Sequence, residues 1–295
     1  MPEPTAGRVR ANGIELAYFE WGAAQRAAGP TVLLAHATGF HARCWDQVIR
    51  HLGERHVIAL DQRGHGRSEK TAITHWAVFG ADLAAFVRAL DLRHLVGVGH
   101  SMGGHAMVDA AAACPDRVLR LVLLDPVIGS RDLYGGGWSV TLAEGQQHPT
   151  AKRKRYFASP EEMFERFRHR PPYANFEPEA LRDYCVHGLL PAPQGGFELA
   201  CPPSVEASIY MTSFTNQAVH DSIRALDLPV FIVRAKEPPP HRGLMDFSSS
   251  PTWRGLVHEF RHGREVYWAD RSHFLPMEIP RRIAEVTVAE GGLAG

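Results

Sequence analysis

The sequence lacks the features that mark several classes of protein. Lys plus Arg and Asp plus Glu both number 32, so the chain has no excess of the basic charge that binding a polyanion requires. No Cys-x-x-Cys motif occurs and the 17 His are scattered along the chain, so neither a metal site nor a cofactor is predicted. The apolar runs are far shorter than the roughly 18–20 residues that span a bilayer. These absences argue against a partner that is a nucleic acid or a membrane, and nothing in the sequence indicates an oligomeric state.

Cysteine is scarce as well. Four Cys in a chain of 295 residues do not make a disulfide framework, and reduced, partly buried thiols are predicted instead. Residues 1–5, Met-Pro-Glu-Pro-Thr, show no basic region followed by an apolar run, so no signal peptide is predicted. A cytoplasmic protein is therefore expected.

Short continuous runs of Val, Ile and Leu recur along the chain and are typical of strands that are covered on both faces. The expected strands are residues 14–19, 31–35, 57–60, 95–99, 119–124, 230–233 and 265–268. Helices are expected between them at residues 76–90, 102–114 and 280–290. This alternation predicts an α/β fold with a doubly wound, mostly parallel sheet. The segment before Thr31 is expected to be an antiparallel edge.

The alternation is interrupted between residues 127 and 225. This stretch contains Gly135–Gly137, a Pro171-Pro172 pair and many aromatic residues, and a structureless loop of that length would be unusual. We therefore expect a mainly helical cap, inserted into a core made of residues 1–126 and 226–295. The basic run Lys152–Arg155 is interpreted as a solvated face of this cap, because one tetrad in a neutral protein does not make a basic surface.

The strongest chemical motif is Gly-x-Ser-x-Gly around Ser101, at residues 99–103. It follows an expected strand and opens an expected helix, and such a sharp strand-to-helix turn exposes the serine hydroxyl. The turn needs small neighbours, which Gly99, Gly103 and Gly104 provide. The helix N-terminus also directs free N–H groups and a positive dipole towards the site.

Together, four segments of the chain resemble the α/β-hydrolase superfamily. They are His-Ala-Thr-Gly at 36–39, Asp-Gln-Arg-Gly-His-Gly-Arg-Ser at 61–68, Gly-His-Ser-Met-Gly-Gly at 99–104 and Ser-His-Phe-Leu at 272–275. The resemblance implies the α/β-hydrolase fold and a triad in the chain order Ser, acid, His. Residues 61–68 resemble a structural turn of the family and are assigned no chemistry.

The resemblance implies a role for several residues. Ser101 is the expected nucleophile and His273 the expected general base, with His100 as a weaker rival for the base. The backbone N–H groups of Thr38 and Met102 are the expected oxyanion hole, and Ala37 in place of a glycine departs from many relatives.

The acid of the expected triad is less clearly marked in the sequence. No Asp follows the expected strand 230–233 at the usual place in the family, where Glu237 stands, and Asp246 is more distant. Some relatives, such as haloalkane dehalogenases, carry the acid one strand earlier, and Asp125 stands there. Asp125 is the favoured acid, and Glu237 remains the alternative.

A serine nucleophile indicates acyl transfer through an acyl-enzyme, so the predicted activity is hydrolysis of carboxylic esters. A lactonase, a C–C bond hydrolase, a perhydrolase and a non-catalytic ligand receptor remain alternatives on the same fold. The aromatic-rich insertion predicts a small apolar ester or lactone as substrate, with Trp138 and Tyr210 affecting substrate choice. Phe40 and Trp45 either line the acyl pocket or pack in the core.

Overall fold

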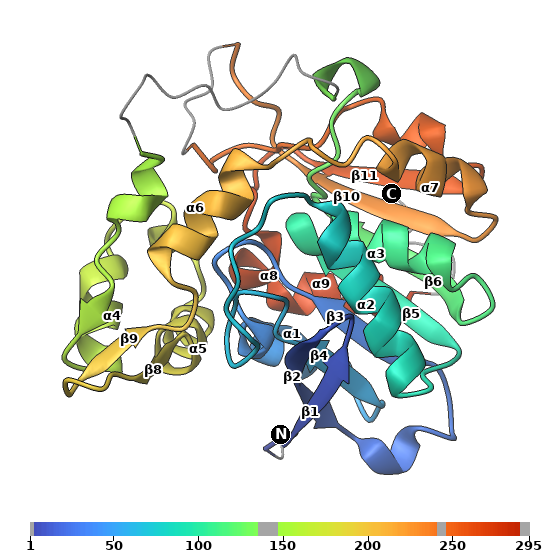
Figure 1. The fold of residues 1–295 in the computed structure, drawn as a ribbon. Helices are drawn as coiled ribbons and strands as arrows, with labels where there is room; N and C mark the ends of the chain where they lie inside the picture. Colours follow the sequence, from blue (N-terminus) through green and yellow to red (C-terminus); the bar gives the residue numbers. More distant parts are fainter. Residues whose placement is uncertain (1–2, 135–146, 241–245, 290–295) are drawn as a thin grey trace.

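A mostly parallel sheet forms the centre of the molecule. The computed structural model describes residues 3–134, 147–240 and 246–289. Its eight-stranded sheet has the order β1-β2-β4-β3-β5-β6-β10-β11 (Figure 1), and β2 pairs antiparallel with both β1 and β4. The strands are β1 (Thr5–Ala11), β2 (Ile14–Trp21), β3 (Thr31–Ala35), β4 (Val57–Leu60), β5 (Leu95–His100), β6 (Val118–Leu124), β10 (Val230–Ala235) and β11 (Gly263–Trp268). The expected doubly wound, mostly parallel sheet with an antiparallel N-terminal edge is confirmed.

Helices cover both faces of this sheet. On one face lie α2 (Ala77–Ala89), α3 (Met102–Ala113) and α7 (Val219–Ala225), and on the other lie α1 (Asp46–Ile49) and α9 (Pro280–Val288). The remaining short helices of the core are η1 (Ala23–Gln25), η2 (Ala42–Trp45), η6 (Leu256–Glu259) and α8 (Leu275–Glu278).

The buried strands contribute alternate residues to two separate hydrophobic clusters. In β3, Leu33 packs into the cluster with α2 and α3, whereas Val32 and Leu34 pack into the cluster with α1 and α9. Successive side chains of a strand point to opposite faces, so a strand covered on both sides is apolar throughout. This burial explains why continuous apolar runs predicted the strands.

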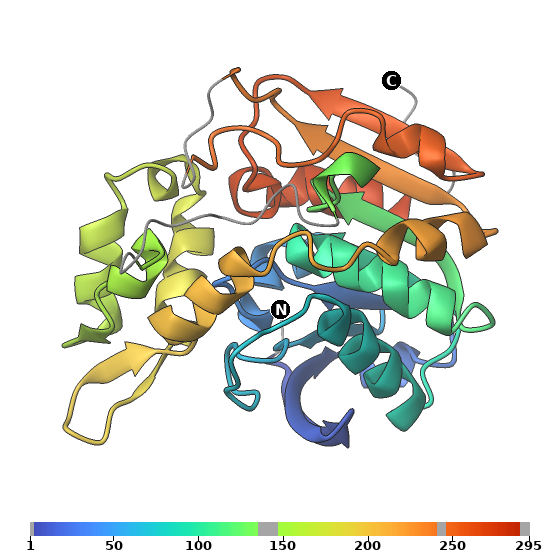
Figure 2. The same cartoon turned by 45° about the horizontal axis from the view of Figure 1, so that its top comes forward.

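Between β6 and β10 the chain forms a lobe beside the sheet, drawn from yellow-green to orange in Figures 1 and 2, and its helix α6 lies on the side next to the sheet. The elements of this stretch are η3 (Arg131–Leu133), η4 (Pro149–Lys152), β7 (Tyr156–Phe157), α4 (Pro160–Phe167), η5 (Tyr173–Asn175), α5 (Pro178–His187), β8 (Leu189–Pro191), β9 (Phe197–Leu199) and α6 (Pro203–Met211). Proline begins α4, α5 and α6, where its missing N–H costs no hydrogen bond.

The lobe differs from the expected mainly helical insertion in two respects. It contains a small antiparallel sheet of order β7-β9-β8, whose strands are too short to leave a period in the sequence. In addition, α7 falls within the expected insertion 127–225 but packs on α3 of the core. Gly135–Gly137 and Trp138 lie outside the described residues.

The basic run of the lobe makes ion pairs within it. Lys154 pairs with Glu162, and Arg155 pairs with Glu198 at 2.7 Å. Arg153 turns inward instead and pairs with the buried Glu206 at 2.5 Å. Arg153 is therefore an exception to the prediction that this basic run forms a solvated face.

None of the helices in the described parts of the chain is long and apolar enough to cross a membrane. All four cysteines, Cys44, Cys114, Cys185 and Cys201, are buried free thiols.

Candidate active site

Ser101 occupies a strained turn between β5 and α3. Its φ of 57° and ψ of −119° lie outside the regions that non-glycine residues normally adopt. The turn is held by its backbone, since the Ser101 N–H donates to the carbonyl of Leu124 at 3.0 Å and the Ser101 carbonyl accepts from Gly104 at 3.0 Å. The strain is therefore offset by hydrogen bonds to β6 and α3.

The glycines around Ser101 permit very close backbone contacts. A Cβ at Gly103 would lie 2.2 Å from the carbonyl oxygen of Ala35, and one at Gly99 would lie 2.4 Å from the carbonyl oxygen of Gly103. A Cβ at Gly104 would lie 2.7 Å from the Cβ of Pro126. These contacts are the physical reason for the small residues that the motif contains.

The structure brings Ser101, His273 and Asp125 into one hydrogen-bonded chain. The Nε2 of His273 lies 2.9 Å from the Oγ of Ser101, and its Nδ1 lies 2.6 Å from the Oδ2 of Asp125. Because an ionised carboxylate only accepts, Nδ1 carries the proton and Nε2 is free to accept from the serine hydroxyl. All three side chains are buried, with Asp125 fully inaccessible.

The carboxylate of Asp125 is surrounded by donors. Its Oδ1 accepts hydrogen bonds from the backbone N–H of Ala235 at 3.0 Å, from Ser250 at 2.5 Å and from Thr252 at 3.2 Å. Such bonds compensate the cost of burying a charge. Ser250 and Thr252 were not singled out from the sequence, because they follow β10 and meet Asp125 only through the pairing of β6 with β10.

The other candidates for the acid lie in different surroundings. Glu237 is 44% exposed in its side chain and pairs with Arg234 at 2.5 Å. Asp246 accepts a hydrogen bond from the backbone of Ser248 at 2.9 Å. Of the three carboxylates, Asp125 is the one that the structure brings to the imidazole of His273.

His100, the rival for the base, contacts His273 in a different way. Its Nε2 donates to the backbone carbonyl of His273 at 2.8 Å, and the two rings lie 5.0 Å apart. Burial lowers the pKa of His100 well below its usual value, so the imidazole is neutral at pH 7. His100 therefore supports the loop that carries His273.

Thr38 and Met102 lie side by side at the turn. The hydroxyl of Thr38 contacts the sulfur of Met102 at 3.5 Å, and both residues are buried. Met102 is the first residue of α3, so its N–H has no acceptor within the helix. The backbone N–H groups of Thr38 and Met102, which the sequence predicts as the oxyanion hole, therefore belong to two residues that contact each other in space.

Two buried histidines fix the loop that contains Thr38. The Nε2 of His65 accepts from the backbone N–H of Gly39 at 3.0 Å, and the Nε2 of His36 accepts from the N–H of Gln62 at 3.0 Å. Burial lowers the pKa of both imidazoles, so each can accept at neutral pH. The turn at residues 61–68 thus positions the loop, which is a role that its motif did not indicate.

A cavity of about 180 Å³ adjoins this loop. Its described lining is largely aromatic and consists of Thr38, Gly39, Phe40, Arg153, Pro172, Tyr173, Tyr184, Glu206, Tyr210, Phe247 and Phe274. Phe40 thus lines the cavity, whereas Trp45 is 2% exposed and packs in the core with α1 and α9. Tyr210, which was singled out from the sequence, lines the cavity as well.

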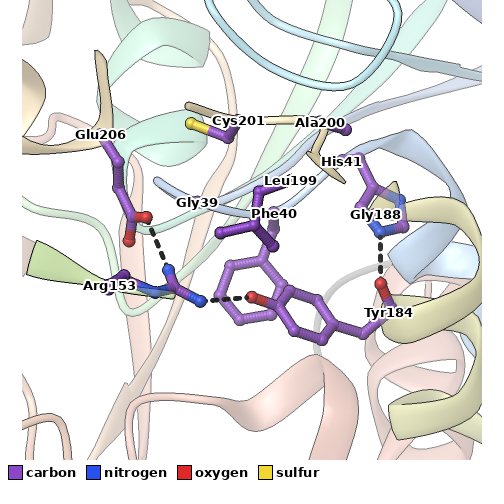
Figure 3. A pocket seen from close by; sticks show the side chains of 10 residues that line it. All are labelled: Gly39, Phe40, His41, Arg153, Tyr184, Gly188, Leu199, Ala200, Cys201 and Glu206. Atoms are coloured by element: carbon purple, nitrogen blue, oxygen red, sulfur yellow. Dashed lines mark hydrogen bonds and ion pairs between the residues drawn. The ribbon is translucent and has the colours of Figure 1, made fainter. Parts of the chain in front are cut away.

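An ion pair interrupts this aromatic lining. Figure 3 shows the guanidinium of Arg153 between the carboxylate of Glu206 and the hydroxyl of Tyr184, which it meets at 2.5 Å and 3.0 Å. Burial raises the pKa of Glu206, and the Arg153 charge partly opposes this shift. Sequence reasoning missed this pair, because Arg153, just after η4, and Glu206 on α6 lie 53 positions apart and carry no signal of their contact.

One group of side chains within the described residues has the spacing of a metal site, namely Asp46, Asp183 and His187. Arg43 already donates to both carboxylate oxygens of Asp46, at 3.0 and 2.8 Å. Gln47 donates to Asp183 at 2.6 Å. Since these donors already engage both carboxylates, we assign no metal to the group.

Comparison with known proteins identifies relatives along most of the chain. The model of a family described as the alpha/beta hydrolase family matches residues 32–286. A lipase from Mycobacterium tuberculosis, LipV, is 41% identical over 111 residues, which is 35% of this chain and 41% of LipV. A non-heme chloroperoxidase from Streptomyces lividans is 28% identical over 77% of this chain and 79% of its own length.

Solved structures share the fold at lower identity. The crystal structure of E-2-(acetamidomethylene)succinate hydrolase has a TM-score of 0.71 and 22% identity, and the match covers 96% of this chain and 97% of the other.

Proposed function

Because the chain belongs to the α/β-hydrolase family, we propose that it is a serine hydrolase that cleaves carboxylic esters through an acyl-enzyme. The observation that carries this proposal is the hydrogen-bonded chain from Ser101 through His273 to Asp125, set on the strained turn before α3. Serine, imidazole and carboxylate in this order are the parts that acyl transfer needs.

In the proposed reaction the Oγ of Ser101 attacks the ester carbonyl while the Nε2 of His273 takes its proton. Asp125 holds the imidazole in the required tautomer and stabilises the imidazolium that forms. The protonated His273 then gives the proton to the departing alcohol, and the C–O bond of the ester breaks. Water attacks the acyl-enzyme by the same proton transfers, which releases the acid and restores Ser101.

The negative oxygen of the tetrahedral intermediate is proposed to accept from the backbone N–H groups of Thr38 and Met102. Loss of one such donor costs roughly 3 kcal/mol of the barrier in other enzymes. The contact between Thr38 and Met102 and the hydrogen bond that fixes Gly39 support this assignment.

We further propose that the lobe within residues 127–225 acts as a cap over the site. It supplies Tyr173, Tyr184 and Tyr210 to the lining of the cavity, whereas Phe40 and Phe274 come from the core. A largely aromatic cavity of this size favours a small apolar ester. The name of the matched lipase is in keeping with an ester substrate.

The first test is hydrolysis of p-nitrophenyl esters from acetate to dodecanoate by the wild type and by Ser101→Ala. We expect turnover in the wild type and a loss of about 10⁶-fold in the variant, because the nucleophile is absent. Equal turnover by a folded Ser101→Ala protein would refute the proposed acyl-enzyme. Circular dichroism of both proteins provides the control for folding.

A second candidate reaction is perhydrolysis, which the chloroperoxidase name of the Streptomyces lividans relative favours. Here hydrogen peroxide replaces water at the acyl-enzyme, the acyl–Oγ bond breaks, and a peracid leaves while Ser101 regains its proton. The test is peracid formation from an ester and hydrogen peroxide. Hydrolysis without any peracid would exclude this candidate and leave the esterase.

A further inference from the structure

The cavity beside Thr38 has one polar end, formed by Arg153, Glu206, Tyr173 and Tyr184. The guanidinium donates to Glu206 at 2.5 Å, to the hydroxyl of Tyr184 at 3.0 Å and to that of Tyr173 at 3.3 Å. Glu206 and Tyr184 are each 3% exposed, so these two side chains are held away from bulk water. Figure 3 shows Arg153 joining the carboxylate to the Tyr184 ring. Buried polar groups of this kind are expected to be satisfied by partners.

The four side chains at this polar end have more hydrogen-bond donors and acceptors than they use with one another. Arginine has no acceptor, so both tyrosine hydroxyls must accept from Arg153, and each keeps its own O–H proton. Arg153 bonds the Oε2 of Glu206, and the Oε1 of Glu206 faces Gly39 of the loop that lines the cavity. The polar end therefore offers O–H donors together with a carboxylate acceptor.

The charges of this end select among polar ligands. Arg153 and Glu206 neutralise each other, so no net positive charge is available for an anionic group of a substrate. A carboxylate would meet the charge of Glu206 within a poorly hydrated space, which is unfavourable. A neutral group that both donates and accepts, such as a hydroxyl, fits the tyrosine donors and the Glu206 acceptor.

The cavity as a whole has room for one aromatic ring. Its volume of about 180 Å³ is close to that of a protein cavity of roughly 150 Å³ that holds benzene. Aromatic contacts also link the polar end to His273: its ring lies 5.6 Å from Phe274, Phe274 lies 5.6 Å from Phe40, and Phe40 lies 5.1 Å from Tyr184. This row of rings connects the polar end of the cavity to the imidazole of the proposed triad.

We propose that the substrate carries a hydroxylated aromatic ring, and that Tyr184, Tyr173 and Glu206, oriented by Arg153, bind its hydroxyl group. This inference rests on the proposed esterase function and specifies its substrate class. The hydroxyl donates to Glu206 and accepts from a tyrosine hydroxyl, while the ring packs among Phe40, Phe247 and Phe274.

The experiment measures binding rather than turnover, so that it does not depend on the reaction. Calorimetry with Ser101→Ala compares methyl 3-(4-hydroxyphenyl)propanoate, methyl 3-phenylpropanoate and the 4-carboxyphenyl analogue. The same three groups are also presented on the alcohol side, as acetates of the corresponding phenylethanols. In at least one series we expect the hydroxyl ligand to bind about tenfold more tightly than the phenyl ligand, and the carboxylate to bind most weakly.

Two further substitutions, each made in the Ser101→Ala background, test which groups are responsible. Tyr184→Phe removes a single hydroxyl and should reduce the preference for the hydroxyl ligand to about threefold or less. Glu206→Gln leaves Arg153 without its counter-charge, so the carboxylate ligand should gain affinity and become the preferred one. Tyr156→Phe is the matched control, because Tyr156 is 45% exposed on β7 and should change no affinity.

Equal affinity for the hydroxyl and phenyl ligands in both series would overturn the inference, as would a preference for the carboxylate ligand before Glu206 is changed. Ester hydrolysis by the wild type without a hydroxyl preference would retain the proposed function and remove this substrate class. A hydroxyl preference without any hydrolysis would retain the binding site and remove the esterase.

Discussion

Asp125 directly follows β6, where its carboxylate meets donors from the last residue of β10 and from the segments after β10 and β11. It accepts from Ala235, Ser250, Thr252 and His273, so both of its oxygens are engaged. A neutral amide at this position can retain the shape of the site, but it cannot accept at every one of these contacts. The ionised state of the side chain is therefore the property that a substitution can test.

Asp125→Asn is expected to lower kcat by a factor on the order of 10⁴, because the amide favours the wrong tautomer of His273. The matched control is Glu237→Gln, which should leave kcat within about twofold, since a surface ion pair contributes little. The measurement is steady-state kinetics on a p-nitrophenyl ester. A large loss of kcat in Glu237→Gln with a mild effect in Asp125→Asn would show that Glu237, and not Asp125, is the acid of the triad.

Gly103 controls how closely α3 approaches β3. Gly103→Ala should lower the free energy of unfolding by about 1–3 kcal/mol, because the added methyl group overlaps the carbonyl of Ala35. Gly29→Ala is the control, since a Cβ there would meet nothing within 4 Å. Urea denaturation compares the two, and an equal stability of both variants would contradict the prediction.

At the scale of the elements, the lobe is attached to the core where α5 contacts η2 and α1. Gln47 of α1 donates to Asp183 of α5 at 2.6 Å. Burial raises the pKa of Asp183 from 3.8 to about 6, and the neighbouring Asp46 acts in the same direction. The negative charge that Asp183 carries at neutral pH therefore destabilises the packing of α5 against the core.

The sign of this effect follows from linkage. A carboxyl group whose pKa is higher in the folded state favours folding while it is protonated, and this stabilisation is lost as the pH rises from 3.8 through about 6. Asp183→Asn should therefore be more stable than the wild type at pH 8, by about 1 kcal/mol once partial exposure is allowed for.

Urea denaturation at pH 8 and at pH 5 tests this, and the advantage of Asp183→Asn should shrink at pH 5. Asp270→Asn removes a charge that is 70% exposed and serves as the control for net charge. An advantage that is the same at both pH values would show that the charge of Asp183 is not its source.

At the scale of the whole molecule, the lobe and the sheet together enclose the cavity. Loops after β3 and β11 provide Phe40 and Phe274 from the core side, whereas η5, α5 and α6 provide the tyrosines from the lobe side. Since the two sides come from segments far apart in the chain, the cavity exists only when the lobe is docked. Substrate size should therefore depend on residues of the lobe.

Tyr210→Ala should shift the preferred p-nitrophenyl ester towards a longer acyl chain, because removing the ring enlarges the cavity, while the wild type should prefer short chains. Tyr156→Ala, on the exposed side of the lobe, is the control and should keep the wild-type ranking. The measurement is kcat/KM across the ester series. An unchanged ranking in Tyr210→Ala would contradict a role of the lobe in substrate choice.

Local pattern alone predicted most strands of the sheet and three of the helices that cover it, α2, α3 and α9. This was possible because a strand buried on both faces is apolar at every position, and 31–35 and 57–60 match β3 and β4. β1 was missed because it is an edge strand whose residues are largely exposed. The family was also recognisable from the sequence, since its motifs are contiguous and each has a local backbone cause.

Tertiary structure alone decided which separated side chains meet. Asp125 and Glu237 were both candidates in the sequence, and the pairing of β6 with β10 directs only Asp125 to His273. Arg153 appeared to belong to a solvated basic run, yet the docking of η4 on α6 turns it towards Glu206. Contacts between segments that lie far apart in the chain depend on how the helices and strands pack. The local hydrophobic periodicity of the sequence contains no information about that packing.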